Sequence, residues 1–196
     1  MRKNIFNGFV VSMMVLGLTE SSAASLSKEK QLDAVEKSYY AIKGMENPSD
    51  EAQLAAVNQD YRAIRFIKNP SKEVQLLVLK ENERAIQFIS NPHKDIQVAA
   101  VNKSYYALQY IKDPAKEAQL AAIKQSYHAI QYIKNPDKDV QLAAVNKDGR
   151  AIEFIENPDK DVQIAAVKKS YQSIRYIDNP CQEAVELAYV DIMRNK

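Results

Sequence analysis

The prolines of this chain recur at a fixed spacing of 22 residues, and this spacing constrains the fold more than any other feature. They are Pro48, Pro70, Pro92, Pro114, Pro136, Pro158 and Pro180. Asn precedes six of them and Asp113 precedes Pro114. Aligned on the prolines, the sequence reads roughly N-P-x-K-E-V-Q-L-A-A-V-x-K-S-Y-x-A-I-x-F-I-K. A fixed period over most of a chain is the signature of a repeat architecture.

The repeats divide the chain after residue 24 into two segments. Residues 25–178 contain seven full repeats, and residues 179–196 form a terminal part-repeat. One helix pair cannot bury its own apolar face, so neighbouring repeats must stack on one another. Paired alanines inside five of the seven apolar runs, such as Ala55–Ala56, would let helices approach closely and argue against strands. We therefore predict an all-α fold, an elongated α-solenoid of seven two-helix repeats with a C-terminal capping helix.

Each repeat contains two helix-start signals. Asn-Pro or Asp-Pro predicts an N-cap with proline at the first position of the first helix. A second capping residue follows thirteen residues after the first, before a shorter helix that should end ahead of the next proline. These second caps are Ser38, Asp60, Asn82, Ser104, Ser126, Asp148 and Ser170.

Residues 1–24 have the pattern of a secretory signal peptide. Arg2 and Lys3 precede the apolar stretch Phe9–Leu18, and Ser22 and Ala24 suit a cleavage site. The first repeat, counted back from Pro48, begins at Ser25. We expect an exported protein, periplasmic or secreted, without a membrane anchor after cleavage. The alternative is an uncleaved amphipathic anchor.

The repeat resembles the variant leucine-rich repeat, through its N-P…E-V-Q-x-A-V pattern. It is also similar to short two-helix bacterial and phage repeats with A-A-V-K elements. The resemblance covers residues 25–196 and implies a right-handed array of alternating α- and 3-10 helices. Its motifs concern packing and turns, so it implies no activity.

Composition excludes several function classes. The formal net charge is only +2, so a strongly basic nucleic-acid binder is excluded. The single cysteine excludes an intrachain disulfide, and His93 and His128 stand at different repeat positions, which argues against a metal site. No known catalytic motif is present. We therefore expect no enzyme activity, no metal and no cofactor.

A glutamine recurs at the seventh position of every full repeat. On a helical wheel it lies between apolar positions, so its amide should be partly buried and hydrogen-bonded. The favoured interpretation is an internal ladder that ties each repeat to the next; the alternative is a row of amides that grips an extended peptide. The residues are Gln31, Gln53, Gln75, Gln97, Gln119, Gln141 and Gln163.

A tyrosine stripe on the second helices is the best candidate for a binding surface. Tyr, Arg and Gln at positions 15 and 19 are assigned to one face of that helix and suit protein recognition. The alternative is that each Tyr packs over the turn between helices, although Glu83 and Gly149 break the row. The aromatic residues at position 20, Phe or Tyr, are assigned to the core, and their free exchange suggests a rim where a hydroxyl reaches solvent. The candidate surface consists of Tyr39, Tyr61, Arg65, Tyr105, Gln109, Tyr127, Gln131, Tyr171 and Arg175.

Three functions are compatible with these features. The first is a non-catalytic scaffold that binds a protein or peptide, including a secreted effector that acts on another cell. The second is a structural or self-assembling element of the cell envelope, joined end to end or as a homodimer through Cys181. The third is an inhibitor or, less favoured, an enzyme. An inert thiol is the alternative for Cys181.

Overall fold

The computed structural model describes residues 26–194, and within this range it contains α-helices and 3-10 helices but no strand. The predicted signal peptide, residues 1–24, lies outside the described residues. The chain divides into two compact units after Ile96. The fold is the predicted all-α solenoid, with a helix pair every 22 residues and a last α-helix at the C-terminus.

The N-terminal unit, up to Ile96, contains three complete helix pairs. They are α3 (Lys28–Lys37) with η1 (Tyr39–Gly44), α4 (Asp50–Gln59) with η2 (Tyr61–Phe66), and α5 (Lys72–Glu81) with η3 (Glu83–Phe88). Each α-helix has ten residues and each 3-10 helix, labelled η, has six. The next helix, α6 (Lys94–Lys103), contains the division between the two units.

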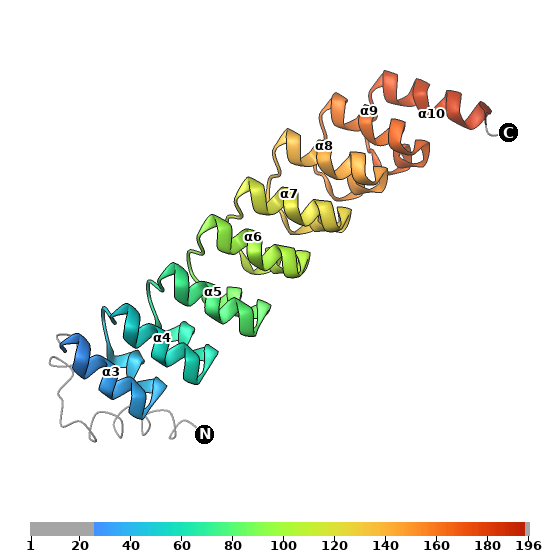
Figure 1. The fold of residues 1–196 in the computed structure, drawn as a ribbon. Coiled ribbons are helices and arrows are strands. Elements are labelled where there is room, and N and C mark those ends of the chain that lie inside the picture. The colour runs from blue at the N-terminus through green and yellow to red at the C-terminus, as the bar shows by residue number, and fades with distance from the viewer. Residues whose placement is uncertain (1–25, 195–196) are drawn as a thin grey trace, which may run out of the picture. The chain divides into compact units, whose positions relative to one another are not determined.

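The C-terminal unit, from Gln97, continues the same alternation. Its further elements are η4 (Tyr105–Tyr110), α7 (Lys116–Gln125), η5 (Tyr127–Tyr132), α8 (Lys138–Lys147), η6 (Gly149–Phe154), α9 (Lys160–Lys169), η7 (Tyr171–Tyr176) and α10 (Gln182–Arg194). Within each unit, consecutive α-helices pack side by side, as the neighbours α3 and α4 or α8 and α9 show (Figure 1). Consecutive 3-10 helices also pack on one another.

The predicted position of proline at the start of the first helix is wrong. The α-helices begin two residues after the proline, and the residue between them is the N-cap, with extended backbone angles. At this position the side chains of Ser49, Ser71 and Asp137 accept a hydrogen bond from the third helical N–H. Asn-Pro instead forms the bend before the cap, where Asn135 and Asn157 adopt positive φ angles of 51° and 49°. Asn tolerates that conformation better than most residues.

The seven predicted second caps are confirmed as the N-cap residues of η1 to η7. The side chains of Asp60, Asn82, Ser126 and Asp148 each accept a hydrogen bond from the N–H two residues later. The β-region angles of the cap end one helix and start the next, so no loop separates the two.

The core lies between the α-helices and the 3-10 helices of each repeat. In the second repeat it contains Ala52, Ala56, Ala63 and Ile64, all fully buried. The alanines leave room for the neighbouring helix, and the isoleucine of each 3-10 helix, or Leu108 in η4, fills the space beneath it. The fifth position of every 3-10 helix is exposed, and so is the second position in all of them except η1.

Candidate binding surface on the 3-10 helices

The predicted tyrosines are half-buried rather than fully exposed. Tyr39, Tyr61, Tyr105, Tyr127 and Tyr171 each occupy the first position of a 3-10 helix. The hydroxyl of Tyr61 accepts a hydrogen bond of 3.1 Å from the side chain of Asn82, the N-cap of the next 3-10 helix. This contact matches the packing interpretation for Tyr61, whose polar end is engaged inside the N-terminal unit.

Tyrosine and the residue four positions later do not share a face. A 3-10 helix has three residues per turn, so residues at i and i+3 line up. Lys43 Nζ accordingly donates to the Tyr40 hydroxyl over 3.2 Å and lies 5.3 Å from the Tyr40 ring centroid. The predicted partners at the fifth helix position are nevertheless exposed: Lys43, Arg65, Gln109, Gln131 and Arg175.

The second residue of each 3-10 helix is a surface residue that the sequence analysis missed. It is Tyr40, Arg62, Arg84, Tyr106, His128, Arg150 or Gln172, and all but Tyr40 are exposed. The variety of residue types hid this position, because no single side chain recurs there. Its alignment with the fifth position follows from 3-10 geometry alone.

The aromatic residue that ends each of η2 to η7 lies at the rim of the core rather than inside it, as the exchange between Phe and Tyr suggested. Phe66, Phe88, Tyr132 and Phe154 are half-buried, and Tyr110 and Tyr176 are exposed. Free exchange between Phe and Tyr fits such a position, where a hydroxyl reaches water.

Side chains of successive repeats form ring contacts across this surface. In the N-terminal unit, Tyr40 meets Phe66 edge-on at 5.1 Å, and the guanidinium of Arg65 lies 4.5 Å from the Phe88 centroid. We call the outward side chains at the second, fifth and sixth positions of the 3-10 helices the aromatic strip. The attraction between each cation and the negative face of the ring helps to hold the cationic side chain in place.

The C-terminal unit has the same strip with more rings and less positive charge. Tyr105 and Tyr106 stack at 4.2 Å, and Tyr106 contacts Tyr132 at 6.0 Å. A hydrogen bond with Tyr106 raises the pKa of the Tyr105 hydroxyl above its usual value. Further along, His128 stacks on Tyr127 at 4.0 Å and contacts Phe154 at 5.7 Å.

Capping aspartates hold two arginines beside the strip. Arg62 contacts both carboxylate oxygens of Asp60, and Arg150 forms the same pair with Asp148. Each guanidinium lowers the pKa of its aspartate, chiefly through the hydrogen bond between the side chains. The aspartates therefore stay ionised near neutral pH and keep these two arginines pointed along the surface.

The seventh-position glutamines lie away from this surface and bond repeat to repeat. Gln53 donates from Nε2 to the carbonyl of Pro48 over 2.9 Å, and its Oε1 accepts from the Ser71 N–H over 3.0 Å. Gln31, Gln75 and Gln163 make the same two contacts. Each donates to the carbonyl at the proline position of its own repeat and accepts from the N–H of the third residue of the next repeat. Gln97 accepts from Ala115 N–H, while Gln119 and Gln141 donate to their proline carbonyls.

A second glutamine clamp was missed because it occurs in only some repeats. Gln59 accepts a hydrogen bond from the Tyr39 N–H and donates to the Val35 carbonyl of the preceding repeat. Gln125 does the same for Tyr105 and Val101. Each clamp satisfies backbone groups at a junction between an α-helix and a 3-10 helix, where helical partners are missing.

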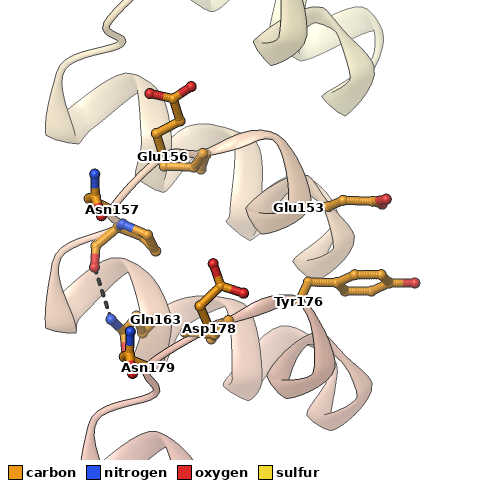
Figure 2. A pocket seen from close by; sticks show the side chains of 10 residues that line it. Glu153, Glu156, Asn157, Gln163, Tyr176, Asp178 and Asn179 are labelled. Carbon is orange, nitrogen blue, oxygen red and sulfur yellow. Dashed lines mark hydrogen bonds between the residues drawn. The ribbon is translucent and has the colours of Figure 1, made fainter.

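A cavity of about 550 Å³ opens between the sixth and seventh repeats, within the C-terminal unit (Figure 2). Glu153, Glu156 and Asp178 supply three carboxylates to its lining, and Tyr176 of the aromatic strip borders it. Gln163 lines it as well, although its amide is engaged in the ladder. The cavity therefore adds an acidic recess to the strip.

Neither metal ligation nor a membrane span is indicated by residues 26–194. Among these residues no group of three or more His, Cys, Asp or Glu is arranged to hold a metal ion. Within the same range no helix has the length and hydropathy needed to cross a bilayer. Cys181 is a half-buried free thiol ahead of α10, and its N–H is bonded to Gln163.

Comparisons with known proteins found no match for this chain. No family model matches the chain, and no curated protein or solved structure is significantly similar to it. The similarity to the variant leucine-rich repeat therefore rests on the sequence motifs alone.

Proposed function

We propose that this chain is an exported, non-catalytic scaffold that binds a protein or peptide along the aromatic strip. The observation that supports the proposal most is the outward row of rings and cations on the 3-10 helices, whose second and fifth positions differ in residue type between repeats. The ladder glutamines and the buried alanines recur, so the repeats keep one frame and change only the exposed side chains. Solenoids build extended binding surfaces in this way.

The two units offer surfaces of different charge. In the N-terminal unit the strip carries Lys43, Arg65 and Arg84, of which Arg65 covers the Phe88 ring. In the C-terminal unit it borders the recess lined by Glu153 and Glu156. The N-terminal strip therefore suits an acidic, partly apolar segment of the partner, and the recess suits a basic side chain.

The test is affinity capture from the host's own envelope and medium, followed by cross-linking and mass spectrometry. Three baits are compared: the wild-type chain, a strip variant with Arg65→Ala and Tyr106→Ala, and a control variant with Leu76→Ala. Leu76 is exposed but lies on α5, away from the 3-10 helices. We expect partners whose cross-links map to the strip, retained by the control and depleted at least about fivefold by the strip variant.

Equal recovery with all three baits, or cross-links that map to the α-helices, would refute the strip as the binding surface. Salt dependence separates the contributions of charge and rings. If moderate salt elutes the captured partner from the wild-type bait but has no such effect on the Arg65→Ala bait, the interaction is assigned to the cations of the N-terminal unit.

A further inference from the structure

The linkers of the C-terminal unit carry charges whose sign changes midway along the unit. The linkers that precede α7, α8, α9 and α10 lie along one edge of these neighbouring helices (Figure 1). The second residue of each linker is exposed, in the order Lys112, Lys134, Glu156 and Asp178. Two positive charges are thus followed by two negative charges at four equivalent repeat positions. We call this surface the linker edge.

The four charges of the linker edge have no ion-pair partner among the described residues. The charges at the starts of the α-helices differ in this respect. There Lys116 pairs with Asp139 of the following repeat, and Lys138 pairs with Asp161. The charges of the linker edge therefore remain available to a partner from outside the chain.

The two negative linkers border the acidic recess between the sixth and seventh repeats. Glu156 and Asp178 line it together with Glu153, and its lining contains no basic residue. Tyr176, at the end of η7, lines the same recess, so the linkers and the ends of the 3-10 helices form one continuous surface (Figure 2). The recess has a volume of about 550 Å³, which leaves room for lysine side chains from outside.

We propose that the linker edge pairs with the linker edge of a second copy in a symmetric, antiparallel dimer. Its twofold axis lies between the fifth and sixth repeats, so the fourth repeat faces the seventh of the copy and the fifth faces the sixth. Lys112 then lies opposite Asp178, and Lys134 lies opposite Glu156. Both lysines of each copy are directed at the acidic recess of the other, which is the self-complementarity that a twofold interface requires.

No other register matches all four charges. An antiparallel pair shifted by one repeat sets either Lys134 or Glu156 opposite its own counterpart, depending on the direction of the shift. A parallel pair in register sets every charge opposite its own counterpart. Like charges in contact are strongly unfavourable at an interface, so the pattern selects one arrangement.

The neighbouring charges are compatible with this register. Asp113 faces an asparagine of the copy, at the residue before the proline. At the fifth position of the 3-10 helices, Glu153 faces Gln131, and Arg175 faces Gln109. No like charges therefore coincide at these positions.

The rings that end the 3-10 helices follow the same symmetry. Tyr110 and Tyr176 are each 37% exposed, and they face one another in the proposed register. Tyr132 and Phe154 are both half-buried and also face one another. The dimer would thus cover the most exposed rings of this row at both of its ends.

In one respect the inference rests on the proposed function, since both treat the acidic recess as a recognition site. It goes further by naming a second copy as the occupant of the recess, and it concerns the C-terminal unit alone. Exposed ion pairs each contribute little and are screened by salt, so the dimer should be weak and sensitive to ionic strength.

Sedimentation equilibrium of the purified full chain in reductant, between about 1 and about 200 µM, tests the proposal. We expect a reversible monomer–dimer equilibrium at about 20 mM salt that shifts to monomer at about 500 mM. Lys134→Glu sets glutamates opposite each other at two symmetric places, so it should weaken the dimer at least about tenfold. Lys168→Glu is the matched control, because it makes the same charge change at an exposed residue in the last turn of α9, away from the linkers. Circular dichroism checks that both variants keep their helix content.

A charge exchange tests the register. Glu156→Lys should weaken the dimer as Lys134→Glu does, and the double variant, in which the opposite charges are exchanged, should dimerise like the wild type. A monomer throughout the range at low salt, a dimer that Lys134→Glu leaves intact, or equal weakening by Lys168→Glu would overturn the proposal. Failure of the double variant to recover would overturn the antiparallel register. A monomeric chain that still captures partners along the aromatic strip would overturn the dimer alone and leave the proposed function standing.

Discussion

Replacing Gln53 with methionine should destabilise the fold by removing both bonds of one ladder step. Methionine has similar length and flexibility, so the change isolates the amide. Gln53 is 5% exposed, and it joins the Pro48 carbonyl to the Ser71 N–H over 2.9 and 3.0 Å. Loss of two net hydrogen bonds, with part of the desolvation cost of their backbone partners, amounts to about 2 to 4 kcal/mol. For a chain of this size that corresponds to a fall in Tm of roughly 5 to 10 °C.

Gln53→Glu should give a loss that depends on pH. A carboxylate can still accept from the Ser71 N–H, but its other oxygen would face the Pro48 carbonyl without a proton. The folded state therefore favours the protonated form of the introduced carboxyl group and raises its pKa above the unfolded value of about 4.3. The deficit relative to wild type should be smallest below that value and should grow as pH rises through the folded pKa.

Urea denaturation of wild type, Gln53→Met, Gln53→Glu and the control Gln131→Glu measures these effects between about pH 3 and about pH 8, a window that spans the ordinary carboxyl pKa values. Gln131 is exposed on η5, so its replacement adds the same charge without removing a buried bond. A loss below about 0.5 kcal/mol for Gln53→Met would refute the ladder as a source of stability. A pH-independent deficit for Gln53→Glu would refute the assigned orientation of the amide.

Three further substitutions have expected outcomes in the same assay. Asp60→Ala should cost about 1 kcal/mol above the ordinary carboxyl pKa, because the cap of η2 is lost. Since folding lowers the pKa of Asp60, this difference should vanish as pH falls through the folded value. Gly149→Ala should cost about 1 to 3 kcal/mol, because its Cβ would lie 2.4 Å from Ser173 Oγ and 2.6 Å from the Ala166 carbonyl oxygen. Lys116→Ala, which removes exposed ion pairs, should leave the free energy of unfolding unchanged within the error of the assay.

The 22-residue spacing was sufficient to predict the helix pairs and the second caps, because both depend on local backbone preferences. The first cap was misplaced by two residues, since Asn-Pro can start a helix or form the bend before one. The face of the second helix was misassigned for a related reason. Six residues from Tyr61 to Phe66 follow three residues per turn, whereas α-helical spacing pairs Tyr61 with Arg65.

Contacts between repeats were harder to predict because they depend on how neighbours pack. Gly149 interrupts the tyrosine row, and by sequence alone it argues against a purely structural role for that position. In the structure it is buried where the seventh repeat closes over the sixth, beside Ser173, which replaces the alanine of other repeats. Gly149 and Ser173, which both depart from the repeat consensus, thus meet at one contact between two repeats. The sequence of a single repeat cannot reveal such a contact.

The repeat separates the residues that stabilise the fold from those that could bind a partner. Ladder glutamines and buried alanines satisfy the backbone and the core within 22 residues, so each repeat holds its neighbours regardless of its outer side chains. Residues of the aromatic strip such as Arg65 and Tyr106 are exposed, and their ring and charge contacts contribute little to stability. Variation on the strip can therefore change the partner without unfolding the chain, which explains how one frame carries a cationic surface in one unit and an acidic recess in the other.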